Sequence, residues 1–344
     1  MKKKETLILI GIIVVLAVYL ALRKTDRTHY TLPDLPQVKA AKIDRIEIMR
    51  DGQALTLSKK DDRWYIAPDE KLADKTKAAG MAEALADLKV TALVSKAASY
   101  NRYELDEKAR IVLKGWRGDK IVRELDLGKA ASTFQHTFVK LPGDPNVYHA
   151  VGHLRPKFDF DADALRDLNV MTLTADDIEE LTLSLGNDSA AFKRQMPETT
   201  AADTENQDAA GEGAEKAPAV PEPQWIDTAT DQPVAAALVG ELMQEFGKLE
   251  CSRYLEAGAA VDLQDQAPAV KLEFIKGDQA HTLTLFAPQD KDTGDYSGIS
   301  SQNDDAFALV QWKVEDLEKK IRAVMGLPPE DEQSPDTAAE ADAS

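Results

Sequence analysis

The chain has 344 residues, of which 43% are apolar and 30% charged, a composition typical of a globular protein with room for two domains. The formal net charge is −18, and residues 197–223 and 328–344, both rich in Ala, Glu and Pro, carry −6 each. The remaining charge is spread over the rest of the chain without a basic face, so we exclude nucleic acid as a partner.

An apolar segment follows the basic start of the chain. Leu7 to Leu22 contains no charge and no proline, lies between Lys2–Lys4 and Arg23-Lys24, and is nearly as long as a membrane-spanning helix. A cleaved signal peptide is the alternative, but no small-residue cleavage site with a polar start behind it is present. We therefore expect a cytoplasmic tip and transmembrane signal anchor over residues 1–24 and a linker over 25–41. The body would then lie outside the cytoplasm, in a single-pass membrane protein whose N-terminus is inside.

The next segment predicts a three-stranded antiparallel meander followed by a helix. Apolar residues alternate at Ile46 and Ile48, Asp51-Gly52 is typical of a tight turn, and a second alternating stretch leads to Trp64. Beyond Trp64, apolar residues recur at spacings of three and four, which predicts an amphipathic helix. The members of this stripe are Ala78, Met81, Leu85 and Leu88.

The same pattern returns later in the chain and indicates an internal repeat. Trp64 and Trp225 lie 161 positions apart, and the stripe returns at the same distance or close to it as Val239, Leu242, Phe246 and Leu249. The strands before Trp225 match at the smaller offset of 135 positions. Segment 197–223 accounts for the difference, and its composition predicts a disordered insertion between the second and third strands of the second copy.

The remainder of each copy supports the repeat. Asn101-Arg102-Tyr103 is matched with Ser252-Arg253-Tyr254, and a hairpin and a short helix follow in both copies. The sequence thus predicts an α+β fold, in which an N-terminal transmembrane helix precedes two tandem repeats of a strand-meander, helix and hairpin unit. The repeats cover residues 42–171 and 176–327, and a disordered acidic tail covers 328–344.

Several of these segments resemble domain-of-unknown-function family 4340. The segments are "RWYI" and "QWI" before the helices, "YNRYELD", "VYHAVGHL" and "YSGISSQNDDAFALV", and the resemblance covers most of the chain after Lys42. It implies a membrane-anchored protein of the bacterial inner membrane without established enzymatic activity. It also implies that such a protein is often encoded beside ABC-type permeases and gliding-motility-like auxiliary proteins. No functional residues carry over from the family.

The histidines do not predict a metal site. His149 and His153 would share one face of a helix, with His136 as a third ligand upstream. However, "NVYHAVGHL" is rich in β-branched and aromatic residues and predicts a strand, in which His149 and His153 are well separated. We therefore interpret them as ordinary core or surface histidines.

Two groups of aspartates have the spacing of calcium loops but lack other requirements. Asp159, Asp161 and Asp163 are not followed by the glycine and the glutamate that such a loop needs, and they are better explained as caps of a helix. Asp290 and Asp292 fail in the same way and predict a turn. We expect no metal and no cofactor.

No catalytic motif is present. The sequence has neither a Gly-x-Ser-x-Gly elbow nor a Walker segment, and its single cysteine, Cys251, is interpreted as a buried apolar residue. We therefore predict that the protein is not an enzyme and has no catalytic residues.

Two functions remain open. The first is a non-enzymatic accessory or scaffold subunit of an ABC-type membrane transport complex, with protein partners in that complex; the family resemblance supplies the transport part. The second is a periplasmic module that binds a glycan or small ligand between the two repeats, with stacking by Trp116, Tyr148 and Tyr296.

Overall fold

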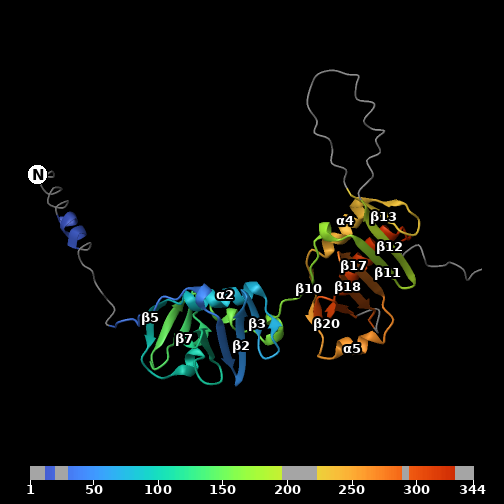
Figure 1. The fold of residues 1–344 in the computed structure, drawn as a ribbon. Coiled ribbons are helices and arrows are strands. Elements are labelled where there is room, and N and C mark those ends of the chain that lie inside the picture. Colours follow the sequence, from blue (N-terminus) through green and yellow to red (C-terminus); the bar gives the residue numbers. More distant parts are fainter. Residues whose placement is uncertain (1–11, 20–29, 196–222, 289–293, 330–344) are drawn as a thin grey trace, which may run out of the picture. The chain divides into compact units, whose positions relative to one another are not determined.

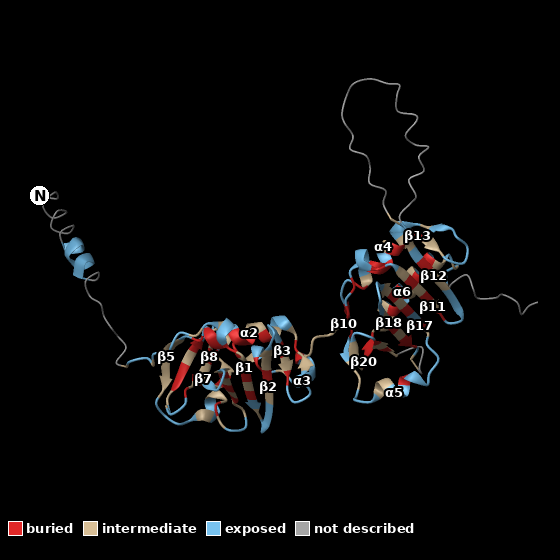
Figure 2. Ribbon diagram, in the orientation of Figure 1, coloured by how far each residue is buried: buried red, intermediate tan, exposed pale blue. Residues whose placement is uncertain are grey.

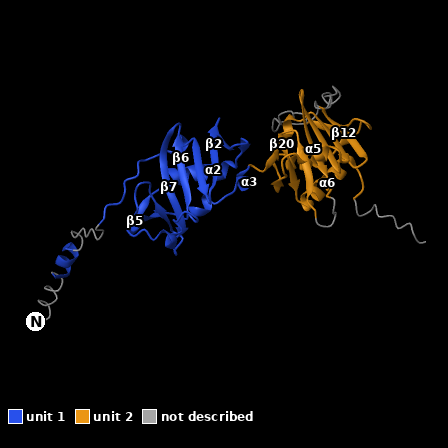
Figure 3. Cartoon of the chain, turned by 90° about the horizontal axis from the view of Figure 1, so that it is seen from below, with its two compact units in different colours: residues 1–166 blue, residues 167–344 orange. Residues whose placement is uncertain are grey.

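The structure, a computed structural model, describes residues 12–19, 30–195, 223–288 and 294–329. The chain divides into two compact units, Met1–Arg166 and Asp167–Ser344 (Figure 3). Each unit has a hydrophobic core of its own. The division falls a few residues before the interval 171–176 at which the sequence repeat was divided.

Alternating apolar residues build one large antiparallel sheet in the first unit (Figure 1). In β1 (Arg45–Arg50), Ile46 and Ile48 are buried and their neighbours are partly exposed. Asp51 and Gly52 both have positive φ, as the tight turn into β2 requires. The strand order is β4-β3-β2-β1-β6-β7-β8-β9-β5. The other strands are β2 (Gln53–Lys60), β3 (Arg63–Ile66), β4 (Lys71–Leu72), β5 (Val90–Ser95), β6 (Ile111–Arg117), β7 (Lys120–Ala130), β8 (His136–Lys140) and β9 (Val147–Val151).

Helix α2 (Lys75–Ala86) covers one face of this sheet, and its inner side is buried (Figure 2). Asp74 caps its N-terminus, because its carboxylate accepts the free backbone N–H groups of Thr76 and Lys77. The buried side chains of the helix include Met81 and Leu85, members of the predicted stripe. Shorter helical turns are η1 (Ala40–Lys42), η2 (Tyr100–Tyr103), η3 (Arg155–Lys157) and α3 (Ala162–Leu165).

The second unit repeats this strand order. Its large sheet has the order β14-β13-β12-β11-β17-β18-β19-β20-β16, which matches the first sheet strand for strand. Trp64 in β3 and Trp225 in the corresponding β13 are both buried. The strands are β11 (Glu180–Leu185), β12 (Asp188–Gln195), β13 (Gln224–Asp227), β14 (Pro233–Val234), β16 (Arg253–Tyr254), β17 (Val270–Lys276), β18 (Gln279–Phe286), β19 (Tyr296–Ser300) and β20 (Asn303–Leu309).

The second unit differs from the first in its helices. Helix α4 (Ala236–Glu245) corresponds to α2, but a further long helix, α6 (Gln311–Met325), packs beside α4 on the same unit. Lys320 of α6 bonds to Asp316 and to Glu245 of α4, and these hydrogen bonds raise the pKa of Lys320. The remaining elements are η4 (Ala175–Asp177), α5 (Ala259–Gln264) and a two-stranded sheet of β10 (Asn169–Met171) and β15 (Leu249–Glu250).

The α+β prediction is correct only in part. Helices do pack on both sheets, but antiparallel sheet dominates the fold, and all strand pairs among the described residues are antiparallel. The physical reason is that apolar alternation continues through most of each repeat, so most of each core is supplied by strands.

The predicted transmembrane helix is contradicted. Among the described residues, no helix is both long enough and apolar enough to cross a membrane. Of the segment from Leu7 to Leu22, residues 12–19 are described, and they are helical. The predicted single-pass location, which rested on this helix, fails with it. The other residues of 1–24 lie outside the described part of the chain.

The structure also contradicts one of the residue matches on which the predicted repeat was based. Arg253-Tyr254 forms β16, the terminal strand that pairs with β20. The strand in this position of the first unit is β5 (Val90–Ser95), whereas Tyr100–Tyr103 forms the turn η2. The match with Asn101-Arg102-Tyr103 was therefore wrong, because two shared residues do not determine which segment pairs with the last strand of a sheet.

The acidic insertion falls between two paired strands. β12 ends at Gln195 and pairs with β13, which begins at Gln224. Apart from Pro223, the predicted insertion 197–223 lies outside the described residues, as does most of the predicted tail 328–344.

Candidate functional site

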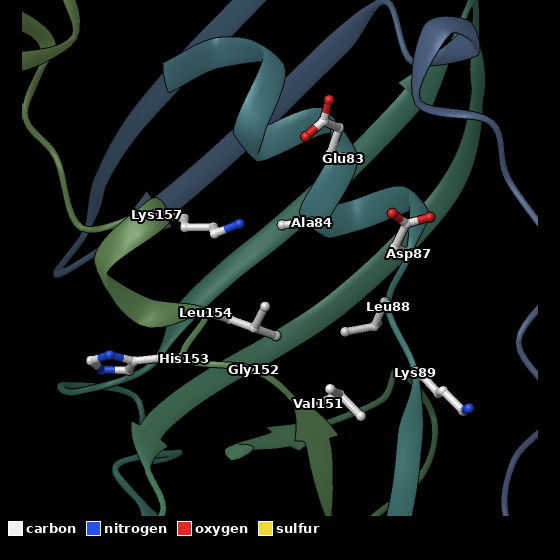
Figure 4. A pocket seen from close by; sticks show the side chains of 10 residues that line it. All are labelled: Glu83, Ala84, Asp87, Leu88, Lys89, Val151, Gly152, His153, Leu154 and Lys157. Carbon is white, nitrogen blue, oxygen red and sulfur yellow. The ribbon is translucent and has the colours of Figure 1, made fainter. Parts of the chain in front are cut away.

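A hollow of about 440 Å³ opens on the first unit at the C-terminal end of α2 (Figure 4). One wall is the last turn of α2 and the three residues that lead into β5, and the other is the end of β9 with the segment that follows it. The lining residues are Glu83, Ala84, Asp87, Leu88, Lys89, Val151, Gly152, His153, Leu154 and Lys157.

The floor of the hollow is apolar and its rim is charged. Leu88 and Leu154 are buried and point toward one another in Figure 4, with Ala84 beside them. Lys89 and His153 point away from the centre in opposite directions. An apolar floor with polar groups around it suits the burial of one apolar side chain of a partner.

The hollow exists because different structures follow the last strand in chain order, β9 in the first unit and β20 in the second. In the second unit, β20 leads directly into α6, which lies along α4. In the first unit, β9 leads into an irregular segment with Pro156 at the start of η3, and Leu154, Phe158 and Leu165 of this segment belong to the same core as α2. This segment fills less space than helix α6 does in the second unit, and a hollow therefore remains beside the last turn of α2.

Exposed apolar side chains continue the hollow outward. Phe134, in the turn between β7 and β8, is 64% exposed and has a φ of +58°, a conformation that bulky residues rarely adopt. Its ring meets that of His153 edge-on, with the ring centroids 5.4 Å apart. Val151 is 47% exposed, and the backbone N–H of Gly152 donates to Gln135 O at 2.7 Å, which ties this turn to the wall of the hollow.

Strand β5 begins where the hollow ends. Lys89 lines the hollow and directly precedes Val90, the first residue of β5, which pairs with Ala150 of β9. β5 is the terminal strand of its sheet, so its outer edge has no neighbouring strand among the described residues. Its six residues, Val-Thr-Ala-Leu-Val-Ser, are uncharged and all half-buried. Its pairing with β9 has two register shifts, between Val90 and Ala92 and between Leu93 and Ser95. An uncharged edge strand can act as a template for another extended chain.

In the second unit, the terminal strand β16 also lies at the edge of its sheet, but residues 167–171 contact the segment around it. β10 pairs with β15, the backbone N–H of Cys251 donates to Leu168 O at 2.9 Å, and the hydroxyl of Tyr254 donates to Asp167 O at 2.8 Å. In the first unit, residues 30–39 precede η1 as β10 precedes η4, yet they form no strand in the described structure.

His136 and His149 lie side by side on the sheet, but they are not part of a metal-binding group among the described residues. The rings of His136 and His149 stack with centroids 5.3 Å apart, and His153 lies at the hollow. Among the residues that the structure describes, no group of three or more His, Cys, Asp or Glu could hold a metal ion. Nε2 of His149 is buried and has no hydrogen-bond partner in the described structure. Burial lowers the pKa of His149, and the neighbouring His136 lowers it further.

We expect the lowered pKa of His149 to make the first unit less stable in acid. The folded state disfavours protonation of His149, whereas the unfolded chain binds the proton near pH 6.5. The free energy of unfolding should therefore fall as the pH drops below 6.5, until the folded-state pKa is passed. Urea unfolding of the wild type and of His149→Phe between neutral pH and about pH 5 measures this. An equally steep acid loss in both proteins would contradict the assignment to His149.

The aspartates with the spacing of a calcium loop form hydrogen bonds and ion pairs within the first unit. Asp161 accepts the backbone N–H of Ala164 at 2.7 Å and so caps α3, as predicted for this group. Asp159 forms ion pairs with Arg50 and Arg155. Asp290 and Asp292 lie outside the described residues.

Each of the other sequence candidates has contacts within its own unit. The guanidinium of Arg45 lies 4.1 Å from the centre of the Trp116 ring, and Tyr148 is buried with its hydroxyl donating to Asp144. Tyr296 packs against the core of the second unit, and Cys251 is buried. The sequence did not indicate Phe134, Lys89 or the edge of β5 as candidates. Their exposure and their position beside the hollow depend on the tertiary structure, and no local pattern marks them.

The comparisons identify the family. A family model described as a domain of unknown function (DUF4340) matches residues 64–272. The chain belongs to the DUF4340 family. The match runs from β3 of the first unit to β17 of the second and so includes the hollow and the whole of β5. Neither the curated proteins nor the solved structures contain a significant match to this DUF4340 chain.

Proposed function

We propose that this DUF4340 protein is a non-enzymatic binding subunit of a larger protein assembly, and that its first unit receives an extended segment of a protein partner. One observation carries the proposal: in the first unit, the edge strand β5 lies beside an apolar hollow and has no neighbouring strand on its outer side among the described residues.

The exposed side chains around the hollow supply the driving force for binding. Phe134 and Val151 stand on its outer side, and burial of such a pair in an interface contributes about 2–4 kcal/mol at 25 cal/mol per Å². Aromatic residues next to a pocket are frequent centres of binding energy. The backbone groups of β5 add hydrogen bonds to any strand laid beside it.

Substitution at the hollow tests the proposal. We expect the double variant Phe134→Ser with Val151→Ser to lose at least about tenfold in affinity for the partner, since about 1.4 kcal/mol corresponds to tenfold. The tagged full-length proteins are purified from native extracts, and the proteins recovered with them are quantified by mass spectrometry. Met49→Ser is the matched control, because Met49 is an apolar residue of the same unit, 50% exposed, and does not line the hollow.

The outcomes separate the possibilities. A protein recovered in stoichiometric amount with the wild type and with Met49→Ser, but not with the double variant, supports the proposal. Equal recovery with all three proteins, or recovery of the chain alone, would overturn it. That the partner is a permease or ATPase of an ABC-type transport complex remains a prediction, and the identity of the recovered protein tests it.

A further inference from the structure

The proposed function leaves the chemistry of the partner open, and the inference below rests on that function. We propose that the segment bound at β5 pairs antiparallel with this strand, is uncharged over its central part, and carries an acidic residue at each end. The assignment follows from the edge itself, from two lysines that flank it, and from the antiparallel pairing of the existing strands.

The edge selects an uncharged, extended segment. β5 consists of Val-Thr-Ala-Leu-Val-Ser, and each residue is half-buried. Because successive side chains of a strand point to opposite faces of the sheet, three of them on each face can contact the side chains of an added strand. A charged residue opposite this stretch would lose hydration without gaining an opposite charge. β-branched and small residues fit the pleated surface best.

The second unit shows the direction of pairing. β10, the segment that precedes the first turn of that unit, runs antiparallel to β15, which leads into the terminal strand β16. Val170 and Met171 of β10 are buried in the core of that unit. All strand pairs of the first sheet are antiparallel, and antiparallel pairs are slightly more stable than parallel pairs, so an added strand at β5 is expected to run antiparallel to it.

Two lysines select acidic ends. Lys89 directly precedes β5 and Lys96 directly follows it, and both are exposed. Neither forms an ion pair within the part of the chain that the structure describes. A partner segment of matching length therefore brings its two ends next to these ammonium groups, where carboxylates are favoured.

The same lysines oppose pairing with a second copy. Two identical β5 strands that pair antiparallel about their common centre place Lys89 of each copy opposite Lys96 of the other. Like charges directly opposite one another destabilise a strand pair, and lysine next to an edge is a common means of preventing such self-association. A different protein is thus the favoured occupant.

Peptides of defined sequence test the inference on the full-length protein. The first peptide alternates Val and Thr and has Glu at both ends, and the second is identical except for Lys at both ends. We expect the first to bind roughly fivefold more tightly, the size expected of two exposed ion pairs, and the preference to shrink at high salt. Fluorescence anisotropy of labelled peptides measures both affinities.

A charge reversal on the protein provides the sharper test. The variant Lys89→Glu with Lys96→Glu should prefer the Lys-ended peptide. The matched control, Lys108→Glu with Lys120→Glu, changes the net charge equally at exposed residues away from β5 and should keep the original preference. Both variants alter exposed side chains only, so circular dichroism and urea unfolding should show intact folds.

The failures of the two proposals are distinguishable. Two further Glu-ended peptides carry N-methyl groups on alternate residues, and in a true strand addition only the one with methyl groups facing β5 loses binding. If this pattern holds but the charge reversal has no effect, the acidic ends are refuted and binding at β5 stands. If N-methylation on either side has the same effect, or no peptide binds, strand addition itself is refuted. A chain that becomes dimeric in sedimentation, with β5 amides newly protected from hydrogen exchange, would instead identify a second copy as the occupant.

Discussion

Replacement of Gly128 by alanine is expected to destabilise the first unit by about 3 kcal/mol. Gly128 lies in β7, and a Cβ atom added to it would stand 2.2 Å from the carbonyl oxygen of Tyr103 and 3.0 Å from Cγ of Leu105. Tyr103 ends the turn η2, and the oxygen belongs to the backbone, so no side-chain rotation relieves the overlap. The turn or the strand must move, and buried Leu105 moves with it.

Hydrogen exchange followed by mass spectrometry measures the effect unit by unit. We expect Gly128→Ala to lower the protection of β6 to β9, while the strands of the second unit keep theirs. Gly80→Ala is the matched control, because nothing lies within 4 Å of its added Cβ and it is inside helix α2. Alanine there should stabilise the unit by about 0.5–1 kcal/mol. Equal effects of the two substitutions would refute the close approach at Gly128.

Replacement of Arg123 by methionine is expected to cost about 2–4 kcal/mol and to release the segment before η1. Arg123 is buried in β7, where its Nε donates to Leu85 O at 2.9 Å and its Nη2 donates to Pro36 O at 2.8 Å. A weaker bond reaches Ala86 O at 3.4 Å. The guanidinium thus satisfies the last carbonyl groups of α2 and lies at the negative end of the helix dipole, although burial lowers its pKa.

Two measurements follow the loss of Arg123. Urea unfolding reports the stability of the unit, and trypsin cleavage after Lys39 reports the release of the segment that Pro36 anchors. Arg117→Met is the matched control, since Arg117 is exposed on the neighbouring strand β6, and it should change stability by no more than about 0.5 kcal/mol. If Arg123→Met leaves cleavage at Lys39 as slow as in the wild type, the role of Arg123 as an anchor is wrong.

The local elements were the most predictable part of this fold. The alternation at Ile46 and Ile48 and the turn at Asp51-Gly52 placed β1 and β2, and the stripe with Met81 and Leu85 placed α2. These patterns depend on residues that are neighbours in the chain, and the backbone repeat of a strand or a helix converts them directly into a buried face.

The errors arose where distant segments decide the outcome. The match of Asn101-Arg102-Tyr103 with β16 failed, because the terminal strand of each sheet is the one that pairs with β9 or β20, and this pairing joins segments far apart in the chain. The strand content was underestimated in the same way. The transmembrane prediction from Leu7–Leu22 rested on hydropathy alone, and no helix among the described residues has the length it requires.

By itself, the sequence determined that two copies of one unit follow each other and where the main apolar faces of the strands and helices lie, since both follow from local periodicity. Only the tertiary structure decided how the edges of the two sheets differ. In the second unit, the carbonyl oxygen of Leu168 accepts the backbone N–H of Cys251 beside the terminal strand, whereas residues 30–39 of the first unit form no strand. The hollow beside α2 was likewise decided by the tertiary structure, because it is left by an irregular segment where the second unit has a packed helix.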